Sequence, residues 1–258
     1  MNTKRISDEA LRVIEQYKNF QIGNSTCSIP YFNNKTTARR AGLRAEIGKG
    51  SPKDIFDEAE HRAIPQKIDL NLLDSENLKK FLVDSNIGID CSGFAYYVLN
   101  EESKSRGKGS IDKHLSFPLS KGIMGKIKSK VRPVENTDVQ TLAHNKNSKI
   151  VSVKEEQVGD IVTMIGGTDG GERDHILIIH QIEYQNFLPV TVHYVHAVAW
   201  PTDGEYGHGI HEGKIEIVDV SKSILEQKWI EMEKTGVDNY TFSRAGKSVT
   251  EIRRLNWF

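Results

Sequence analysis

The sequence has few cysteines, no long apolar run and no excess of charge of either sign. Cys27 and Cys91 are its only cysteines, so a disulfide framework is excluded and we expect a reduced, intracellular chain. The longest apolar stretches, such as Ile176 to Ile179, are far shorter than a membrane-spanning helix. Lysine plus arginine and aspartate plus glutamate number 35 each, so the overall charge indicates neither nucleic acid nor an anionic membrane as a partner.

The first residues also lack the uninterrupted apolar segment of a signal peptide. Asp8, Glu9 and Glu15 interrupt this part of the chain. We therefore expect a cytoplasmic protein, or one exported by a route that is not visible in the sequence. The oligomeric state stays open.

Helical patterns fill the first half of the chain and strand patterns fill the second. Apolar spacing, helix start signals and composition predict helices over residues 8–18, 36–46, 52 onward, 73–83 and 91–101. Runs rich in β-branched and aromatic residues predict strands over 149–153, 160–165, 175–184, 189–200, 214–220 and 250–258. The predicted class is therefore α+β, with the helices first and an antiparallel sheet after them. The basic segment 104–132 is predicted to be a solvated surface, with an anionic-ligand site as the alternative.

Two histidine pairs have the spacing H-x-x-H, which can indicate a metal site. His193 and His196 lie in a strand pattern, where an offset of three residues places them on opposite faces. His208 and His211 flank a glycine in a predicted loop and could bind zinc, but no paired cysteines accompany them. We expect no metal and no organic cofactor.

Cys91 lies in the stretch GIDCSGF, at the predicted start of a helix. The helix dipole and the unpaired N–H groups of a first turn stabilise a thiolate, which lowers the pKa of the cysteine. The same N–H groups can bind the oxyanion of a tetrahedral intermediate. The alternative is that Cys91 is a small, buried apolar residue.

The motif DCSGF, residues 90–94, resembles the signature of the NlpC-type cell-wall cysteine peptidases. Three further segments follow in the family's order: VGDIVTM at 158–164, DHILII at 174–179 and YVHAVAW at 194–200. The resemblance implies a papain-like fold with the nucleophile at the N-terminus of the central helix. It also implies a helical N-terminal elaboration over residues 1–85 and a catalytic core over 86–258, packed as one compact domain.

The resemblance assigns the catalytic roles to Cys91 as nucleophile, His175 as base and His196 as the residue that orients His175. Strand geometry bears on the last assignment. In a hairpin of residues 175–183 and 190–199, a register that pairs odd with even numbers places His175 and His196 on one face. The other register would favour His193 as the residue that orients His175. The alanine after His196 favours His196.

The resemblance also implies a substrate site. Asp90 and Ser92 match positions that hold the free amine of a short peptide, and Tyr31, in PYFNN, matches a tyrosine beside the nucleophile. The alternative for Tyr31 is an aromatic residue in a turn that covers the core.

The implied function is cleavage of an amide bond through an acyl-enzyme, with a peptidoglycan-derived peptide or muropeptide as substrate and no nucleic-acid partner or membrane span. Two alternatives stay open. The same fold could support an acyltransferase, a deamidase or a thioesterase, or the chain could be a non-catalytic binding module.

Overall fold

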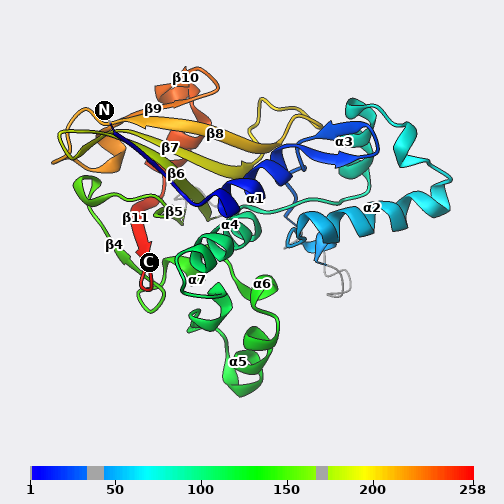
Figure 1. Cartoon of the computed structure of the whole chain (residues 1–258), viewed down its shortest axis with the longest axis horizontal. Coiled ribbons are helices and arrows are strands. Elements are labelled where there is room, and N and C mark those ends of the chain that lie inside the picture. The colour runs from blue at the N-terminus through cyan, green and yellow to red at the C-terminus, as the bar shows by residue number, and fades with distance from the viewer. Residues whose placement is uncertain (1, 34–43, 167–173) are drawn as a thin grey trace.

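The computed structural model describes residues 2–33, 44–166 and 174–258. The helices are α1 (Asp8–Lys18), α2 (Pro52–Gln66), α3 (Ser75–Asp84), α4 (Cys91–Ser105), α5 (Gly122–Val131), α6 (Pro133–Asn136), α7 (Val139–Ala143) and α8 (Tyr240–Gly246). The strands are β1 (Asn2–Arg5), β2 (Phe20–Ile22), β3 (Ser25–Cys27), β4 (Ser148–Ile150), β5 (Ile161–Ile165), β6 (His175–Gln185), β7 (Leu188–Val198), β8 (Gly209–Glu216), β9 (Lys228–Glu231), β10 (Lys234–Thr235) and β11 (Val249–Leu255). The predicted α+β class is confirmed (Figure 1).

The main sheet of the described residues contains nine strands in antiparallel pairs. Its order is β10-β9-β8-β7-β6-β5-β11-β4, and β1 pairs with β6 outside this path. Strand β5 pairs with the first half of β6 and β1 pairs with the second half, because β6 is long enough to hold both. Helix α4 packs against β6 and β7 and is itself covered by α1 (Figure 1).

Local signals explain where the predicted helices begin. Helix α2 starts at Ser51 with a capping box, in which the Ser51 hydroxyl accepts from the Asp54 N–H and the Asp54 carboxylate accepts from the Ser51 N–H. Helix α4 starts after Asp90, whose carboxylate accepts from the Gly93 N–H. The helix predicted over 36–46 lies largely outside the described residues, and Ala45–Ile47 form a single 3₁₀ turn.

The structure adds helices α5 to α8 in segments for which no helix was predicted, and it corrects the prediction of strands in two places. The first 85 residues are not only helical, because β1 joins the main sheet and β2 pairs with β3 in a separate two-stranded sheet. Strand β8 begins at Gly209 rather than at residue 214, so His211 lies in a strand and not in a loop. In both places tertiary pairing extends the sheet into segments with weak local strand patterns.

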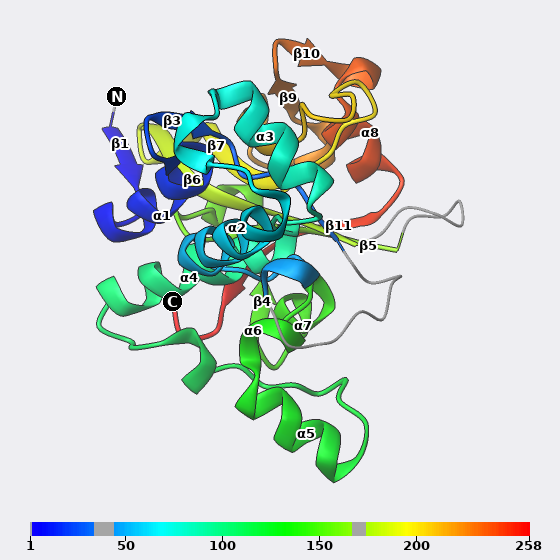
Figure 2. The same cartoon turned by 90° about the vertical axis from the view of Figure 1, so that its right-hand side faces the viewer.

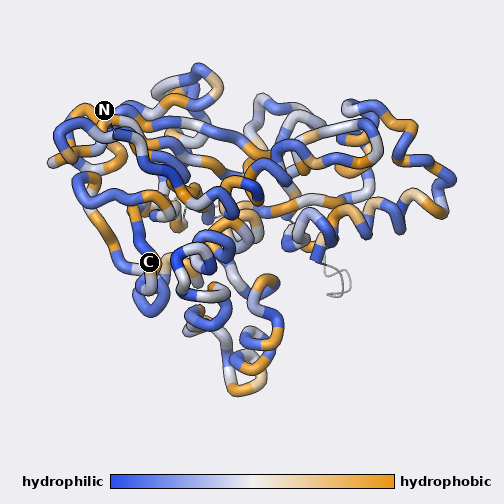
Figure 3. Tube along the Cα trace, viewed as in Figure 1, coloured by the Kyte–Doolittle hydropathy of each residue, from blue (hydrophilic) through white to orange (hydrophobic). Residues whose placement is uncertain are grey.

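Two apolar clusters lie on the two faces of the main sheet. The cluster under α4 draws on residues from Ile6 to Leu255, so the two ranges 1–85 and 86–258 share it. The cluster on the other face contains Tyr194 and Trp229. Because both faces are covered, the central strands β5 and β6 contain runs of buried residues, and hydrophobic segments recur along the whole described chain (Figure 3). Within the described ranges, no helix is long and apolar enough to cross a membrane.

Candidate active site

Cys91 is the first residue of α4 and is 4% exposed. The chain that leads into it is held on both sides. The Ile89 N–H donates to the Pro30 carbonyl at 3.0 Å, and the Phe32 N–H donates to the Ile89 carbonyl at 3.0 Å. On the other side, the Asp90 N–H donates to the Gly48 carbonyl at 2.8 Å. The start of α4 is therefore anchored by backbone pairing before the thiol is reached.

The same pairing brings Tyr31 close to the thiol. Tyr31 forms a parallel bridge with Ile89, two residues before Cys91. Its backbone N–H donates to Nδ1 of His208 at 3.0 Å. Burial, with the nearby thiol of Cys91, raises the pKa of Tyr31. The phenol is therefore neutral at physiological pH and can serve as a hydrogen-bond donor.

A buried ammonium occupies the polar atoms of Asp90 and Ser92. Nζ of Lys49 donates to Asp90 Oδ1 at 2.9 Å, to Ser92 Oγ at 2.6 Å and to the Thr137 carbonyl at 2.9 Å. The side chains of Lys49 and Asp90 are 6% and 3% exposed. The predicted role of Asp90 and Ser92 in holding a substrate amine stays a prediction. In this structure both side chains already bind an ammonium of the protein itself.

The next component is a pair of buried histidines on neighbouring strands. His175, the first residue of β6, is 1% exposed, and His196, on β7, is fully buried. Nε2 of His175 lies 2.6 Å from Nδ1 of His196. Sγ of Cys91 points toward the carbonyl oxygen of Asp174, the residue before His175, at 3.9 Å. The structure thus brings Cys91 to the start of the strand that carries His175 and joins His175 to His196.

Strand register explains why His196, and not His193, meets His175. Strands β6 and β7 pair Ile178 with Val195 and Ile179 with Tyr194, which is the odd-with-even register. Of the two registers that the sequence left open, this one is present at this end of the hairpin. A shift follows after Ile179, and His193 lies beyond it, where its Nε2 is 3.1 Å from Oε1 of Glu183.

Glu231, on β9, is a component that sequence reasoning missed. It is 1% exposed, and its Oε1 lies 3.1 Å from Nε2 of His196 and 3.2 Å from Nδ1 of His211. Its Oε2 accepts a hydrogen bond from the hydroxyl of Tyr194 at 2.7 Å. One signal was present in the sequence: Glu231 is two residues after the buried Trp229, so an acid lies on the apolar face of a strand.

Electrostatics keep Glu231 ionised. Burial by itself would raise its pKa, but attraction to the protonated form of His196 and the hydrogen bonds from His196, His211 and Tyr194 lower the pKa of Glu231 to about 2. Burial lowers the pKa of His196, and the charge of Glu231 opposes this effect. Burial lowers the pKa of His175 well below its usual value, and the positive charge of Arg244 on α8 adds to the shift.

These charge states assign the protons. An ionised carboxylate only accepts, so Nε2 of His196 carries a hydrogen toward Glu231. Neutral His196 then has its lone pair on Nδ1, and His175 must donate to it from Nε2. Neutral His175 therefore has its lone pair on Nδ1. This atom is buried and has no hydrogen-bond partner among the described residues, so it is the basic atom that the arrangement leaves for chemistry.

Within the described residues, one group has the donor set of a metal site. His196, His211 and Glu231 each offer one ligand atom, and these atoms lie within 4.8 Å of one another. The contacts of 3.1 and 3.2 Å to Glu231 are hydrogen-bond distances. In the described structure these contacts join the three side chains into one buried polar group.

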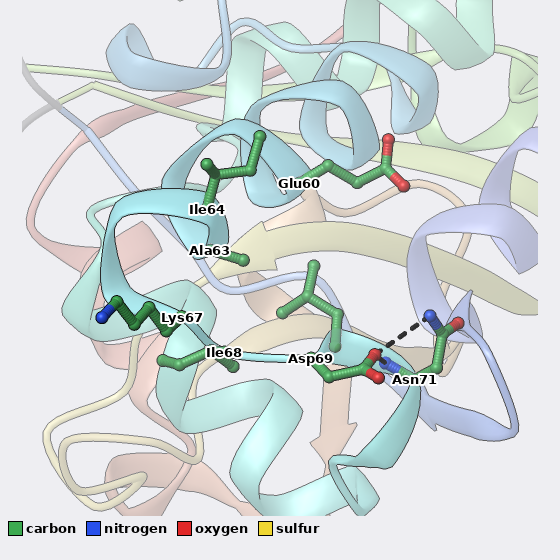
Figure 4. Close-up of a pocket in the computed structure, with 8 residues that line it drawn as sticks. Glu60, Ala63, Ile64, Lys67, Ile68, Asp69 and Asn71 are labelled. Carbon is green, nitrogen blue, oxygen red and sulfur yellow. Dashed lines mark hydrogen bonds between the residues drawn. The ribbon is translucent and has the colours of Figure 1, made fainter.

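The pocket drawn in Figure 4 lies elsewhere, at the end of α2 and the 3₁₀ turn Leu70–Leu72. Asp69 accepts hydrogen bonds from the backbone and side chain of Asn71 there. None of the predicted site residues lines this pocket. A scan against protein-family models and a search of curated proteins found no match for the chain.

Proposed function

We propose that the chain is a cysteine hydrolase of NlpC type that cleaves an amide bond in a peptidoglycan-derived peptide. The observation that carries the proposal is the buried chain of hydrogen bonds from His175 through His196 to Glu231, which starts beside Cys91. Burying polar groups among apolar strands costs free energy that their hydrogen bonds only partly recover, so a buried polar chain is a candidate for a functional role. Nucleophilic catalysis by Cys91 requires a basic nitrogen and a group that orients it, and this chain of side chains contains both.

In the proposed reaction, Sγ of Cys91 attacks the substrate carbonyl while its proton moves to Nδ1 of His175. The N-terminus of α4 stabilises the negative oxygen of the intermediate. The carbon–nitrogen bond then breaks, His175 returns the proton to the leaving amine, and a thioester forms on Cys91. Water, activated by the same nitrogen, hydrolyses the thioester and restores the thiol.

The lowered pKa of His175 favours one form of this mechanism. A histidine that is neutral at physiological pH acts as a general base during the attack, in place of a resting pair of thiolate and imidazolium. Tyr31, close to the thiol and neutral, would donate a hydrogen bond to the bound substrate. His196 and Glu231 are positioning residues, because they act through His175.

The buried ammonium of Lys49 bears on the substrate. Asp90 and Ser92 can hold a substrate amine only if that amine displaces Lys49 from three hydrogen bonds. We propose that the site accepts peptides whose amino end is blocked or extended. Peptides with a free amine next to the scissile bond would then be the poorer substrates.

The test is hydrolysis of synthetic stem peptides by the full chain, read by mass spectrometry. Each peptide is offered with a free and with an acetylated amino end, and Cys91→Ala is compared with Cys27→Ala. We expect cleavage by the wild type and by Cys27→Ala, loss with Cys91→Ala, and a preference for the acetylated peptides. Products joined to an added amine would indicate acyl transfer. Full activity of Cys91→Ala would refute the proposal.

A further inference from the structure

Helix α5 turns an apolar stripe away from the protein. Ile123, Met124, Ile127 and Val131 are 77%, 78%, 52% and 73% exposed. At about 100° per residue they fall within an arc of about 100° on one side of the helix. We call these four residues the α5 stripe. Leu119, just before the helix, is 51% exposed.

The side of α5 that packs on the protein is the small and polar one. Ser129, on the side opposite the stripe, is 2% exposed. Its hydroxyl donates to the Gly125 carbonyl at 2.9 Å and lies 2.6 Å from the hydroxyl of Ser120. A helix held only for the stability of the fold buries its apolar side. In α5 this arrangement is inverted, and the helix lies at the end of a lobe that projects from the sheet (Figures 1 and 2).

Lysines border the α5 stripe along both edges. By the same helical spacing, Lys126 and Lys130 follow one edge, and Lys121 and Lys128 follow the other. All four are exposed, and none forms an ion pair with a residue of the described ranges. No acidic residue occurs between Lys113 and Glu135 in the sequence. The apolar stripe is therefore set in a surface of one charge sign.

A basic pocket adjoins the same lobe. Lys126 and Lys130 line it together with Lys113 and Lys146, and its volume is about 400 Å³. Ammonium groups arranged around a hollow attract phosphate-bearing groups. The positive charge beside the α5 stripe therefore continues into a pocket that can bind an anionic headgroup.

From these observations we propose that α5 docks on the surface of a bilayer that contains anionic phospholipid. The α5 stripe would enter the boundary between headgroups and acyl chains, and the bordering lysines would contact headgroup phosphates, with their stems along the apolar surface. The zero net charge of the chain does not oppose this binding, because charges act over about one Debye length, roughly 8–10 Å in physiological salt. The attraction to the anionic bilayer comes from the lysines that border the α5 stripe.

The test is co-sedimentation of the full chain with lipid vesicles. One set contains phosphatidylcholine alone, and the other contains equal parts of phosphatidylcholine and phosphatidylglycerol. We expect binding to the anionic vesicles only, with loss near 0.5 M salt. The double variant Lys126→Ala/Lys130→Ala should lower the partition coefficient roughly 30-fold, and Ile123→Glu/Ile127→Glu by at least as much.

The control is Ile64→Glu, an equally exposed isoleucine (73%) on α2, which should bind like the wild type. Because the changed side chains lie on the surface, thermal unfolding should be unaltered in all variants. Cys91→Ala should bind fully, which separates docking from the proposed catalysis. Absence of vesicle binding, or equal binding by the stripe variant, would overturn the proposal. If the chain bound an acidic protein but showed no affinity for vesicles, the bilayer would likewise be ruled out as the surface on which α5 docks.

Discussion

Replacing Glu231 by glutamine tests the proton assignment with almost no change of shape. Glutamine keeps an oxygen that can accept from His196, but its amide nitrogen can also face His196 and donate. A donor at that position forces the hydrogen of neutral His196 to Nδ1 and that of His175 to its own Nδ1. The basic lone pair of His175 would then lie on Nε2 and point at His196, and Nδ1 could no longer accept a proton.

The size of the effect follows from the structure. Loss of the orienting carboxylate next to a catalytic histidine lowers kcat by about 10²- to 10⁴-fold. Stability changes as well: a carboxyl pKa lowered from 4.5 to about 2 corresponds to at most about 3 kcal/mol of unfolding free energy. Because the pKa is lowered on folding, this contribution is present above pH 4.5 and is lost as the pH falls toward 2. Glu231→Gln should lack it at neutral pH.

The assay is alkylation of Cys91 by iodoacetamide, which needs the base but no substrate, run beside peptide hydrolysis. Burial raises the pKa of Cys27 to about 11, so Cys27 stays a thiol and serves as the slow reference. Glu231→Asp, which keeps the charge, should recover part of both rates. Glu216→Gln, the same change at an exposed ion pair on β8, should leave them unaltered.

One outcome would refute the reasoning. If Glu231→Gln is folded at the assay temperature and both its alkylation and its hydrolysis match the wild type, the chain of hydrogen bonds does not serve the thiol. The Glu231–His196–His175 arrangement would then be structural. The same conclusion would hold if alkylation fell only in proportion to the fraction of folded protein. The folded fraction is therefore measured by circular dichroism in each sample.

Three further predictions concern charge and burial. Arg244→Gln removes a positive charge that lowers the pKa of His175, so the acid limb of the kcat/KM profile should move to higher pH; an unmoved limb would show that Arg244 does not act on the base. Lys49→Met leaves the buried carboxylate of Asp90 without its ion pair and should lower the unfolding free energy by about 3–5 kcal/mol in urea titrations; a loss below 1 kcal/mol would contradict this. Burial lowers the pKa of His180 to about 4, so stability should be full above pH 6.5 and fall by about 3 kcal/mol toward pH 4, a loss that His180→Gln should abolish in melting curves.

The sequence by itself determined the class of the fold and most elements with strong local patterns. Helices α1 to α4 begin where caps and apolar spacing place them, because these signals act within one turn. The long strands β6 and β7 follow from their β-branched residues, but the sequence left two registers open for their pairing, and the structure shows which one forms. The roles of Cys91 and His175 stay predictions, which the alkylation and hydrolysis experiments address.

Only the tertiary structure decided what surrounds these residues. Glu231 reaches His196 across two strand pairings, and Lys49 reaches Asp90 across a loop, so no local pattern marks either contact. Helix α5 shows the same limit from the other side: its apolar spacing does not say which face is buried. Which face is buried depends on packing against surfaces that distant parts of the chain form, and the local spacing of apolar residues contains no information about those surfaces.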